Sequence, residues 1–168
     1  EKVIIMPPVY DNFILKTVAS GRYLLENTVK FEAGRWQIDF DDLEAKARDP
    51  KARVRLLSNP HNPVGRSWTR EELKRVGDIC RENGVFVVSD EIHADLTFKG
   101  QKHVPWGTLG EEYVENCIVS TSFSKTFNVS GLLMADIVIP NPHVRSRFRH
   151  FMVDRLNNIA QNPFGVEA

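Results

Sequence analysis

Short apolar runs bounded by polar or turn-forming residues recur along the chain and are typical of buried β-strands. They occupy residues 3–6, 54–57, 85–88, 117–120 and 137–139. Pro7 and Pro8 end the first run, because proline has no backbone N–H to donate to a sheet. Residues 23–31 are expected to form one further strand.

Segments of helical character separate these runs. The clearest begins with Thr69-Arg70-Glu71-Glu72, which has the spacing of a capping box, and continues with apolar residues at helical intervals. This helix should end near Asn83-Gly84, a favourable C-terminal pair. Further helices are expected around residues 13–19, over residues 40–47 with acidic residues in the first turn, and from about 143 to 155.

Strands that alternate with helices of ordinary length indicate βαβ units and a mostly parallel sheet. The fold class predicted from this order is α/β, as a three-layer αβα arrangement. The 168 residues suffice for one sizeable core, and we find no internal repeat or low-complexity segment.

Composition narrows the function classes. The chain is 42% hydrophobic and 26% charged, which is ordinary for a soluble globular protein. Lys+Arg and Asp+Glu are equal at 22 each, so nothing favours binding to nucleic acid or to an anionic membrane. No apolar run approaches the ~20 residues of a membrane span. The two cysteines, Cys80 and Cys117, are too few and too far apart for a disulfide framework or a CxxC metal site. We therefore expect a cytoplasmic protein.

Both ends of the sequence indicate an internal piece of a larger protein. The chain enters its first strand directly after Glu1-Lys2, and the sequence ends where a helix is expected to begin. No signal-peptide pattern is present at the N-terminus.

Polar, chemically capable residues follow three of the predicted strands. Asn62 lies in the turn sequence Asn59-Pro60-His61-Asn62-Pro63-Val64-Gly65, whose prolines and glycine favour a rigid loop. Asp90 ends the apolar run 85–88, and His93 follows it closely. The carboxyl ends of parallel strands meet at one edge of a sheet, so these side chains are expected to lie near one another.

Lys125 follows the strand 117–120 among hydroxyl and amide side chains, in Ser122-Phe123-Ser124-Lys125-Thr126-Phe127-Asn128. A lysine and an acid at this edge are the groups that pyridoxal 5'-phosphate (PLP) requires, an amine for a Schiff base and a carboxylate for the pyridinium nitrogen. Such a lysine should be partly buried to be reactive near neutral pH. Each residue also has an ordinary alternative: a surface lysine, a helix-capping aspartate, a structural histidine or a loop asparagine.

Together these motifs resemble the fold-type I PLP enzymes of the aminotransferase class I/II superfamily, over essentially the whole chain. The resemblance is greatest to the PatB/MalY-type cystathionine β-lyases, which are C–S lyases. It is carried by the sequences at residues 59–66, 88–95 and 122–128, with Gly131-Leu132, in the family order. It implies the large PLP-binding domain of the aspartate aminotransferase-like fold, with the N-terminal arm and the C-terminal small domain outside these residues.

The resemblance also assigns roles. Lys125 would form the Schiff base and move protons at the substrate Cα, and Asp90 would pair with the ring nitrogen. Asn62 would hydrogen-bond the phenolic oxygen of the cofactor, with His93 near the place where relatives carry a tyrosine. The remaining roles are phosphate binding by Ser122 and more weakly by Ser124, and stacking on the ring by Tyr10, for which a core tyrosine is an equal alternative.

One departure from the family pattern bears on the reaction. Many aminotransferases of this superfamily have a phosphate-binding arginine where this chain has Leu133. The lyase-like subgroup tends to lack it too, so Leu133 favours a lyase and leaves phosphate anchoring partly unexplained. The family's phosphate loop and its carboxylate-binding arginine are expected outside these residues, and family members are homodimers with shared sites. These residues alone are therefore expected to turn over substrate poorly or not at all.

The expected function is a PLP-dependent C–S β-lyase that acts on cystathionine or related sulfur amino acids to give thiol, pyruvate and ammonia. The first alternative is a PLP-dependent aminotransferase, which shares the early steps. A second is a non-catalytic aminotransferase-like regulatory domain. A Schiff-base enzyme without PLP is more remote, because it would not need Asp90 and Asn62 beside Lys125.

Overall fold

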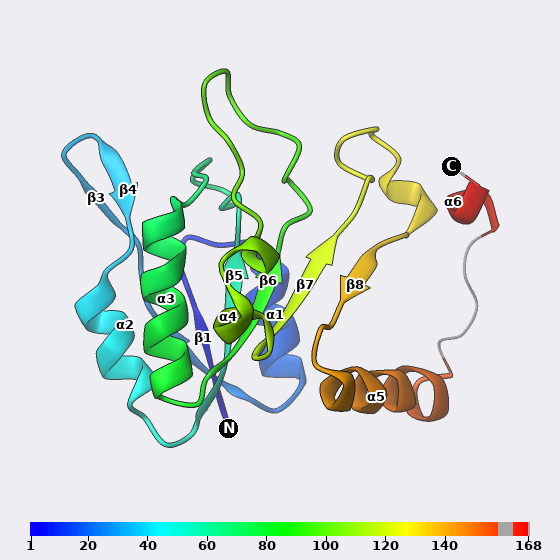
Figure 1. Ribbon diagram of the computed structural model, residues 1–168, viewed down its shortest axis with the longest axis horizontal. Helices are drawn as coiled ribbons and strands as arrows, with labels where there is room; N and C mark the ends of the chain where they lie inside the picture. Colours follow the sequence, from blue (N-terminus) through cyan, green and yellow to red (C-terminus); the bar gives the residue numbers. More distant parts are fainter. Residues whose placement is uncertain (158–162, 168) are drawn as a thin grey trace.

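A six-stranded sheet is the centre of the molecule (Figure 1). The computed structural model describes residues 1–157 and 163–167. The strands lie in the order β2-β1-β5-β6-β7-β8, all parallel to their neighbours except β8, which runs antiparallel to β7. Their bounds are β1 (Lys2–Ile5), β2 (Tyr23–Glu26), β5 (Ala52–Ser58), β6 (Phe86–Asp90), β7 (Cys117–Thr121) and β8 (Asp136–Val138).

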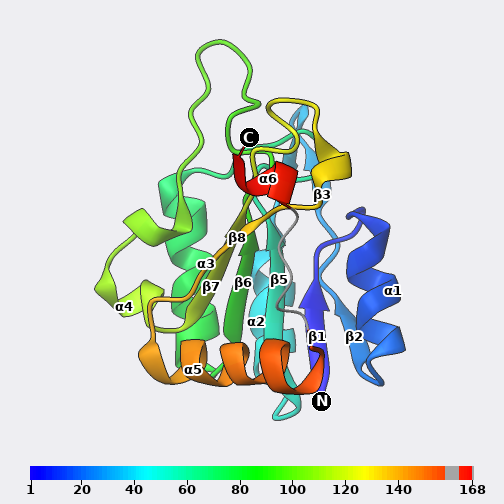
Figure 2. The same cartoon turned by 90° about the vertical axis from the view of Figure 1, so that its right-hand side faces the viewer.

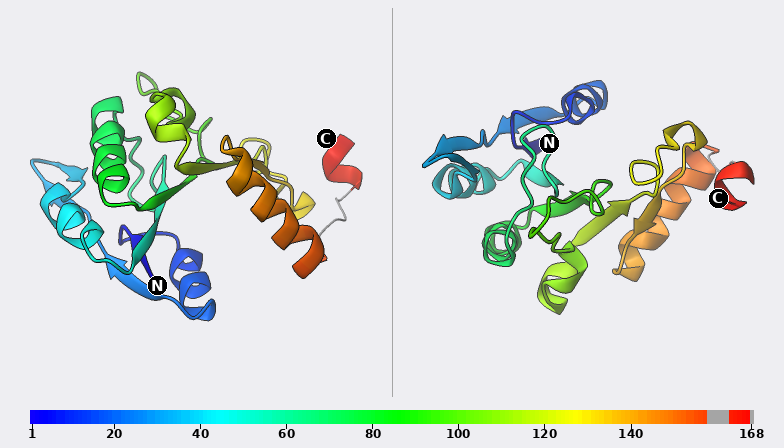
Figure 3. Two further views of the ribbon diagram at one scale, coloured as in Figure 1. Left: turned by 60° about the horizontal axis from the view of Figure 1, so that its bottom comes forward. Right: turned by 90° about the horizontal axis from the view of Figure 1, so that it is seen from above.

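Helices lie on both faces of this sheet (Figure 3). One face carries α2 (Phe40–Ala47), α3 (Arg70–Glu82) and α4 (Glu111–Val114), and the other carries α1 (Asp11–Ala19), whereas α5 (Pro142–His150) lies by the β8 edge of the sheet. The remaining helical segments are η1 (Trp106–Thr108), η2 (Ser130–Leu132), a π-helical turn η3 (Phe151–Arg155) that continues α5, and α6 (Pro163–Glu167). The prediction of a three-layer αβα fold with a mostly parallel sheet is confirmed.

The hydrophobic core includes the layer between the sheet and helices α2 and α3. Ile4, Leu57, Leu73 and Val76 are fully buried there, and Trp68 packs into the same cluster. Burial of each large apolar side chain contributes roughly 1.5–3 kcal/mol relative to exposure. This packing fixes the strands from which the polar loops at the carboxyl edge emerge.

The capping box predicted for α3 is present. The Thr69 hydroxyl accepts a hydrogen bond from the Glu72 N–H at 3.2 Å, and the Glu72 carboxylate accepts one from the Thr69 N–H at 2.8 Å. Two N–H groups that lack helical partners are thereby satisfied. At its other end the helix stops at Asn83 and Gly84, as the sequence predicts, with Gly84 at a positive φ of 65°.

The prediction of a single strand over residues 23–31 is wrong. β2 ends at Glu26, and β3 (Lys30–Glu32) pairs with β4 (Arg35–Gln37) as a separate antiparallel hairpin. The break is at Asn27, which is fully buried and whose side-chain amide donates to the Asp39 carbonyl and the Asp42 carboxylate. These contacts draw the backbone out of the sheet toward the start of α2.

The described residues are informative about membrane-spanning helices, metal sites and disulfides. Within residues 1–157 and 163–167, every helix is too short or too polar to cross a bilayer. The same residues bring together no group of three or more His, Cys, Asp or Glu side chains that could hold a metal ion. Cys80 and Cys117 are both buried and unpaired.

Candidate active site

The predicted site residues follow four strands that are neighbours in the sheet. Tyr10 comes after β1, Asn62 after β5, Asp90 and His93 at or after β6, and Lys125 after β7. Because β1, β5, β6 and β7 are parallel, their loops emerge at the same edge (Figure 2). This is the edge at which open α/β sheets bind ligands.

Asp90 is the last residue of β6 and is held between two serines. It is paired in register with Ser58 of β5 and with Ser120 of β7. Its Oδ1 accepts a hydrogen bond from the Ile92 N–H at 3.2 Å, whereas Oδ2 has no hydrogen-bond partner among the described residues. Burial raises the pKa of the Asp90 carboxyl above its usual value, against the opposing effects of the Ile92 N–H and the nearby His93. A carboxylate in this position favours a cationic or N–H partner.

His93 is half-buried beside Asp90. Burial lowers the pKa of the His93 imidazole, the Asp90 carboxylate acts in the opposite direction, and the charge of Lys125 lowers it further. The three groups therefore lie close enough to influence one another electrostatically. At neutral pH a lowered pKa favours the neutral imidazole, which can both donate and accept a hydrogen bond.

Asn62 lies in a loop that is fixed by its backbone. Its N–H donates to the Ser58 hydroxyl at 3.2 Å, and the next turn is closed by the Gly65 N–H donating to the His61 carbonyl at 2.8 Å. The side-chain amide of Asn62 has no partner among the described residues, so it is available to a ligand. His61 beside it is buried, and its Nε2 lies 2.9 Å from the Pro8 carbonyl, which ties this loop to the one that follows β1.

Lys125 lies in the loop that follows β7, at the same edge. Its Nζ is 3.4 Å from the Ser130 hydroxyl, and the side chain is exposed. The expectation that the Lys125 amine is partly buried is thus wrong within the part of the chain that the structure describes. The amine is exposed because this loop projects beyond the end of β7 (Figure 1). The loop itself is well defined, with the Val129 N–H bonded to the Ser124 carbonyl and Asn128 at a positive φ of 55°.

The two serines predicted to bind phosphate already support this loop. The Ser122 hydroxyl donates to the Met134 carbonyl at 2.7 Å and accepts from the Ser124 N–H at 3.0 Å. Ser122 is buried and Ser124 is half-buried. To donate to a phosphate, Ser122 must therefore exchange its bond to Met134. Leu133, in the place of the expected arginine, has a positive φ of 53° and is 86% exposed.

Tyr10 lies at the start of α1 and is partly exposed. Its ring packs edge-on against Phe13, with 6.3 Å between the ring centroids. The phenol oxygen lies 2.5 Å from the Asn12 side-chain nitrogen. At 44% exposure, Tyr10 is not a core residue.

A cavity of about 700 Å³ adjoins these residues. Asn62 and His93 line it, together with the loop that follows β6 and with Arg35 at the start of β4, whereas Asp90, Lys125 and Tyr10 lie outside its lining. Its volume is within the range of small-molecule sites. The cavity thus extends the candidate site on the side of Asn62 and His93.

Glu91 is a residue of this site that the sequence gives no signal for. It directly follows Asp90, one residue beyond the end of β6, and it is buried. Its carboxylate accepts hydrogen bonds from the Ser89 hydroxyl at 2.9 Å and the Trp106 N–H at 2.8 Å, and it lies 2.8 Å from His103 Nε2. Glu91 thereby fastens both ends of the loop that borders the cavity.

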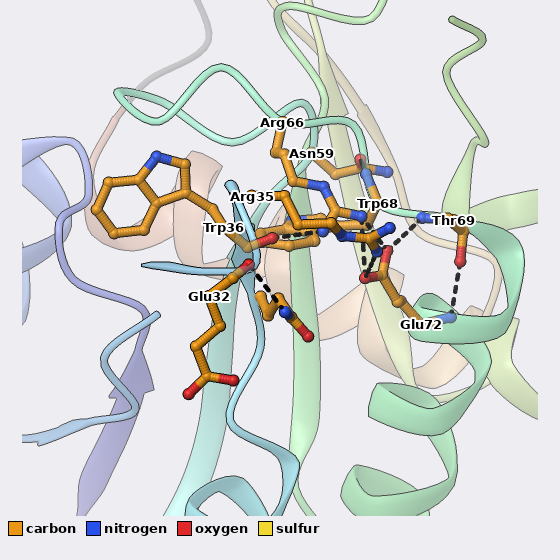
Figure 4. A network of polar contacts seen from close by, with 9 residues as sticks. Glu32, Arg35, Trp36, Asn59, Arg66, Trp68, Thr69 and Glu72 are labelled. Atoms are coloured by element: carbon orange, nitrogen blue, oxygen red, sulfur yellow. Dashed lines mark hydrogen bonds and ion pairs between the residues drawn. The ribbon is translucent and has the colours of Figure 1, made fainter. Parts of the chain in front are cut away.

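A second network supports the loop that carries Asn62 (Figure 4). Arg66 makes two contacts with the Glu72 carboxylate, at 2.6 and 2.9 Å, and donates to the Trp36 carbonyl at 2.6 Å. Its guanidinium also lies over the Trp68 ring, 4.7 Å from the centroid. One arginine therefore joins the loop to the hairpin and to the first turn of α3.

The donor set fits PLP by its chemistry. The half-buried Asp90 carboxylate has a free oxygen that suits the ring nitrogen, and the unpartnered Asn62 amide suits the phenolic oxygen. The primary amine of Lys125, at an adjacent strand end, suits the aldehyde carbon. The roles of these individual residues remain predictions.

A three-layer αβα fold with such groups at the carboxyl edge of its sheet places the chain in the α/β class, whose members bind ligands at that edge. The chain belongs to the aminotransferase class I and II family, whose family model matches residues 1–158. The family resemblance predicted from the three motifs is thereby confirmed.

Curated relatives and solved structures agree with this assignment. The chain is 43% identical to cystathionine beta-lyase PatB of Bacillus subtilis over 148 residues, which cover 88% of this chain and 38% of that protein. It is 34% identical to protein MalY of Escherichia coli, with 88% and 37% covered. It is also similar to cystalysin from Treponema denticola, whose structure contains a pyridoxal 5'-phosphate cofactor, with a TM-score of 0.89, 34% identity, and 98% of this chain and 41% of that chain covered. The chain thus spans less than half the length of these relatives.

Proposed function

We propose that residues 1–168 form part of the large PLP-binding domain of a PLP-dependent C–S β-lyase. The reaction is cleavage of cystathionine or a related sulfur amino acid to thiol, pyruvate and ammonia. One observation carries the proposal: Asn62, Asp90 and Lys125 follow three neighbouring parallel strands in a chain that is 43% identical to a cystathionine β-lyase. A PLP-bound C–S lyase from Staphylococcus hominis, with a TM-score of 0.89 and 32% identity over 99% of this chain and 42% of that chain, supports it.

In this proposal Asp90 keeps a proton on the ring nitrogen of the cofactor. PLP, when bound, supplies an electron sink for negative charge that develops at the substrate Cα. The free Oδ2 of Asp90 is the acceptor for the ring N–H. Because burial raises the pKa of this carboxyl, its charged form is disfavoured without a partner and gains most from pairing.

Asn62 and Lys125 would hold other parts of the cofactor. The free amide of Asn62 orients the cofactor through its phenolic oxygen, and the neutral His93 can contact the same oxygen. The Lys125 amine binds the cofactor and then takes and returns the proton at the substrate Cα. General acid–base work of this kind contributes roughly 10²–10⁴-fold to a rate. Ser122 and Ser124 bind the phosphate, and Tyr10 stacks on the ring.

The remaining parts of the proposal concern the assembly. The working protein is a cytoplasmic homodimer, in which a neighbouring subunit and further segments complete the site. An amino-acid substrate fits the family to which the chain belongs. Residues 1–168 alone turn over substrate poorly or not at all, because the exposed Lys125 lacks the surroundings that would bury it.

The competing function is amino transfer, and some relatives fit it, although not better than they fit the lyase. The chain is 32% identical over 146 residues to kynurenine–oxoglutarate transaminase of Dictyostelium discoideum, and 78% of this chain is covered.

Incubating the full-length protein with PLP and cystathionine should release thiol and pyruvate without an added 2-oxo acid. Brisk amino transfer that depends on a 2-oxo acid, with no thiol released, would reverse the proposal. Cofactor binding without either reaction would favour a non-catalytic domain.

A further inference from the structure

The cavity beside Asn62 and His93 carries an excess of positive charge. Arg35, Arg66 and Lys99 line it, and no Asp or Glu is among its lining residues within the part of the chain that the structure describes. Such a cavity attracts an anionic group, because its lining carries three cations and the carboxylate nearest to them, that of Glu72, neutralises only one.

The two arginines differ in how far their charge is already used. Arg66 is largely buried, with a side-chain exposure of 16%, and it is committed to Glu72 and the Trp36 carbonyl. Arg35 is 57% exposed and makes one long contact, 3.4 Å from its Nη2 to Glu72 Oε1 (Figure 4). The Glu72 carboxylate is already satisfied by Arg66 and the Thr69 N–H. Arg35 therefore retains most of its charge for a ligand.

Lys99 faces the same cavity from another loop. It lies between β6 and η1, in the loop whose ends Glu91 fastens through Ser89 and Trp106. Lys99 is exposed, and none of the described carboxylates pairs with it. Two available cations, one on the β3–β4 hairpin and one on this loop, thus border one cavity.

The cavity also has an apolar part. Pro60, Pro63, Leu96 and Phe98 line it, and Phe98 is 80% exposed. Apolar walls with cations at the rim suit a group that has an aliphatic or thioether stem and a terminal carboxylate.

We propose that this cavity binds the far end of the substrate, a sulfur substituent that ends in a carboxylate, through Arg35 and Lys99. The inference rests on the proposed function and deepens it, since it names the residues that hold the far carboxylate of such a thioether substrate. Arg35 and Lys99 are then residues that determine specificity. The Cα proton remains the task of Lys125.

The test compares two substrates that differ only at the far end. Thiol release by the full-length, PLP-loaded protein is measured with S-(2-carboxyethyl)cysteine and with S-propylcysteine. Wild type should prefer the carboxylate substrate, and Arg35→Gln should lower its kcat/KM about fivefold, chiefly through KM, with less than a twofold change for S-propylcysteine. Lys99→Gln should act in the same direction, and Arg35→Lys should restore most of the preference. Arg53→Gln, at an exposed arginine at the opposite end of β5, is the matched control and should change neither substrate.

Each outcome has a defined meaning. Equal effects of Arg35→Gln and Lys99→Gln on the two substrates, or no effect on either, would overturn this inference while leaving the lyase intact. A wild-type preference that 0.5 M salt leaves unchanged would also count against it, because exposed ion pairs are screened. If wild type releases thiol from neither substrate, the proposed function fails and this inference with it.

Discussion

Asp90, the last residue of β6, is paired in register with Ser120 of β7, the strand whose following loop carries Lys125. The pairing places an acid and an amine at adjacent ends of two parallel strands. In the proposed lyase this spacing lets one cofactor ring meet both groups.

Asp90→Asn should separate the function of this carboxylate from its effect on stability. We expect the activity of the full-length protein to fall by about 10²-fold or more, because the ring nitrogen loses its anionic partner. The cofactor-free protein should become more stable at neutral pH, since burial disfavours the charge at this position. Urea midpoints of wild type and variant measure the difference.

The pH dependence of that difference has a definite sign. Because the pKa of Asp90 is raised on folding, the folded state holds the proton more tightly, so stability falls as pH rises from the usual aspartate pKa through the raised one. Asp90→Asn lacks this loss. The stability advantage of Asp90→Asn over wild type should be absent below the usual aspartate pKa and complete above the raised pKa of Asp90. A stability advantage that is largest in acid would contradict the burial of this carboxylate.

Gly77→Ala should destabilise the protein although alanine is the better helix former. A Cβ at Gly77 would lie 2.5 and 2.8 Å from two ring carbons of Tyr113, where α3 packs against α4. The clash should cost about 1–3 kcal/mol, against a gain of about 1 kcal/mol from helix propensity. Thermal or urea unfolding measures the net loss. In a Tyr113→Ala background, which lacks the ring, Gly77→Ala should instead raise stability by the helix-propensity gain relative to Tyr113→Ala alone. A stabilising single variant would show that the two helices separate easily.

Glu72→Gln should weaken the loop that carries Asn62. The substitution removes the negative charge that holds the partly buried Arg66, so we expect a loss of about 1–3 kcal/mol. Glu71→Gln, at the neighbouring exposed position of the same helical turn, is the control and should change stability by less than about 0.5 kcal/mol. Equal effects of the two variants would mean that only the charge of the first turn matters.

Both cysteines should resist thiol reagents in the native protein. Burial raises the pKa of the Cys80 and Cys117 thiols to about 11 each, and both side chains are almost fully buried. At pH 8 the reactive thiolate is therefore scarce and inaccessible. An aromatic disulfide reagent should titrate no thiol before unfolding and both thiols after it. Rapid reaction of either native thiol would contradict the packing around β7 and α3.

Much of the fold follows from local patterns in the sequence. The Thr69–Glu72 capping box and Asn83-Gly84 locate α3 at both ends, and the apolar runs locate the parallel strands. The carboxyl-edge rule for parallel sheets then brings Asn62, Asp90 and Lys125 to one edge without further information.

Contacts between distant residues explain what the sequence does not reveal. The run at residues 23–31 has the composition of one strand, but the buried Asn27 bonds to groups near α2 and breaks it. The contact of Glu91 with His103 joins a strand end to a loop, and no periodicity indicates it. The exposure of Lys125 also depends on which segments cover its loop, which is a property of tertiary structure.

The central claim is that Lys125 is the lysine that binds the cofactor covalently. The direct measurement is PLP titration of the full-length protein, followed by borohydride reduction, proteolysis and mass mapping of the phosphopyridoxyl label. We predict a single labelled peptide that contains Lys125, and its loss in Lys125→Ala. Stoichiometric label on another lysine, or none after saturation with PLP, would contradict the account.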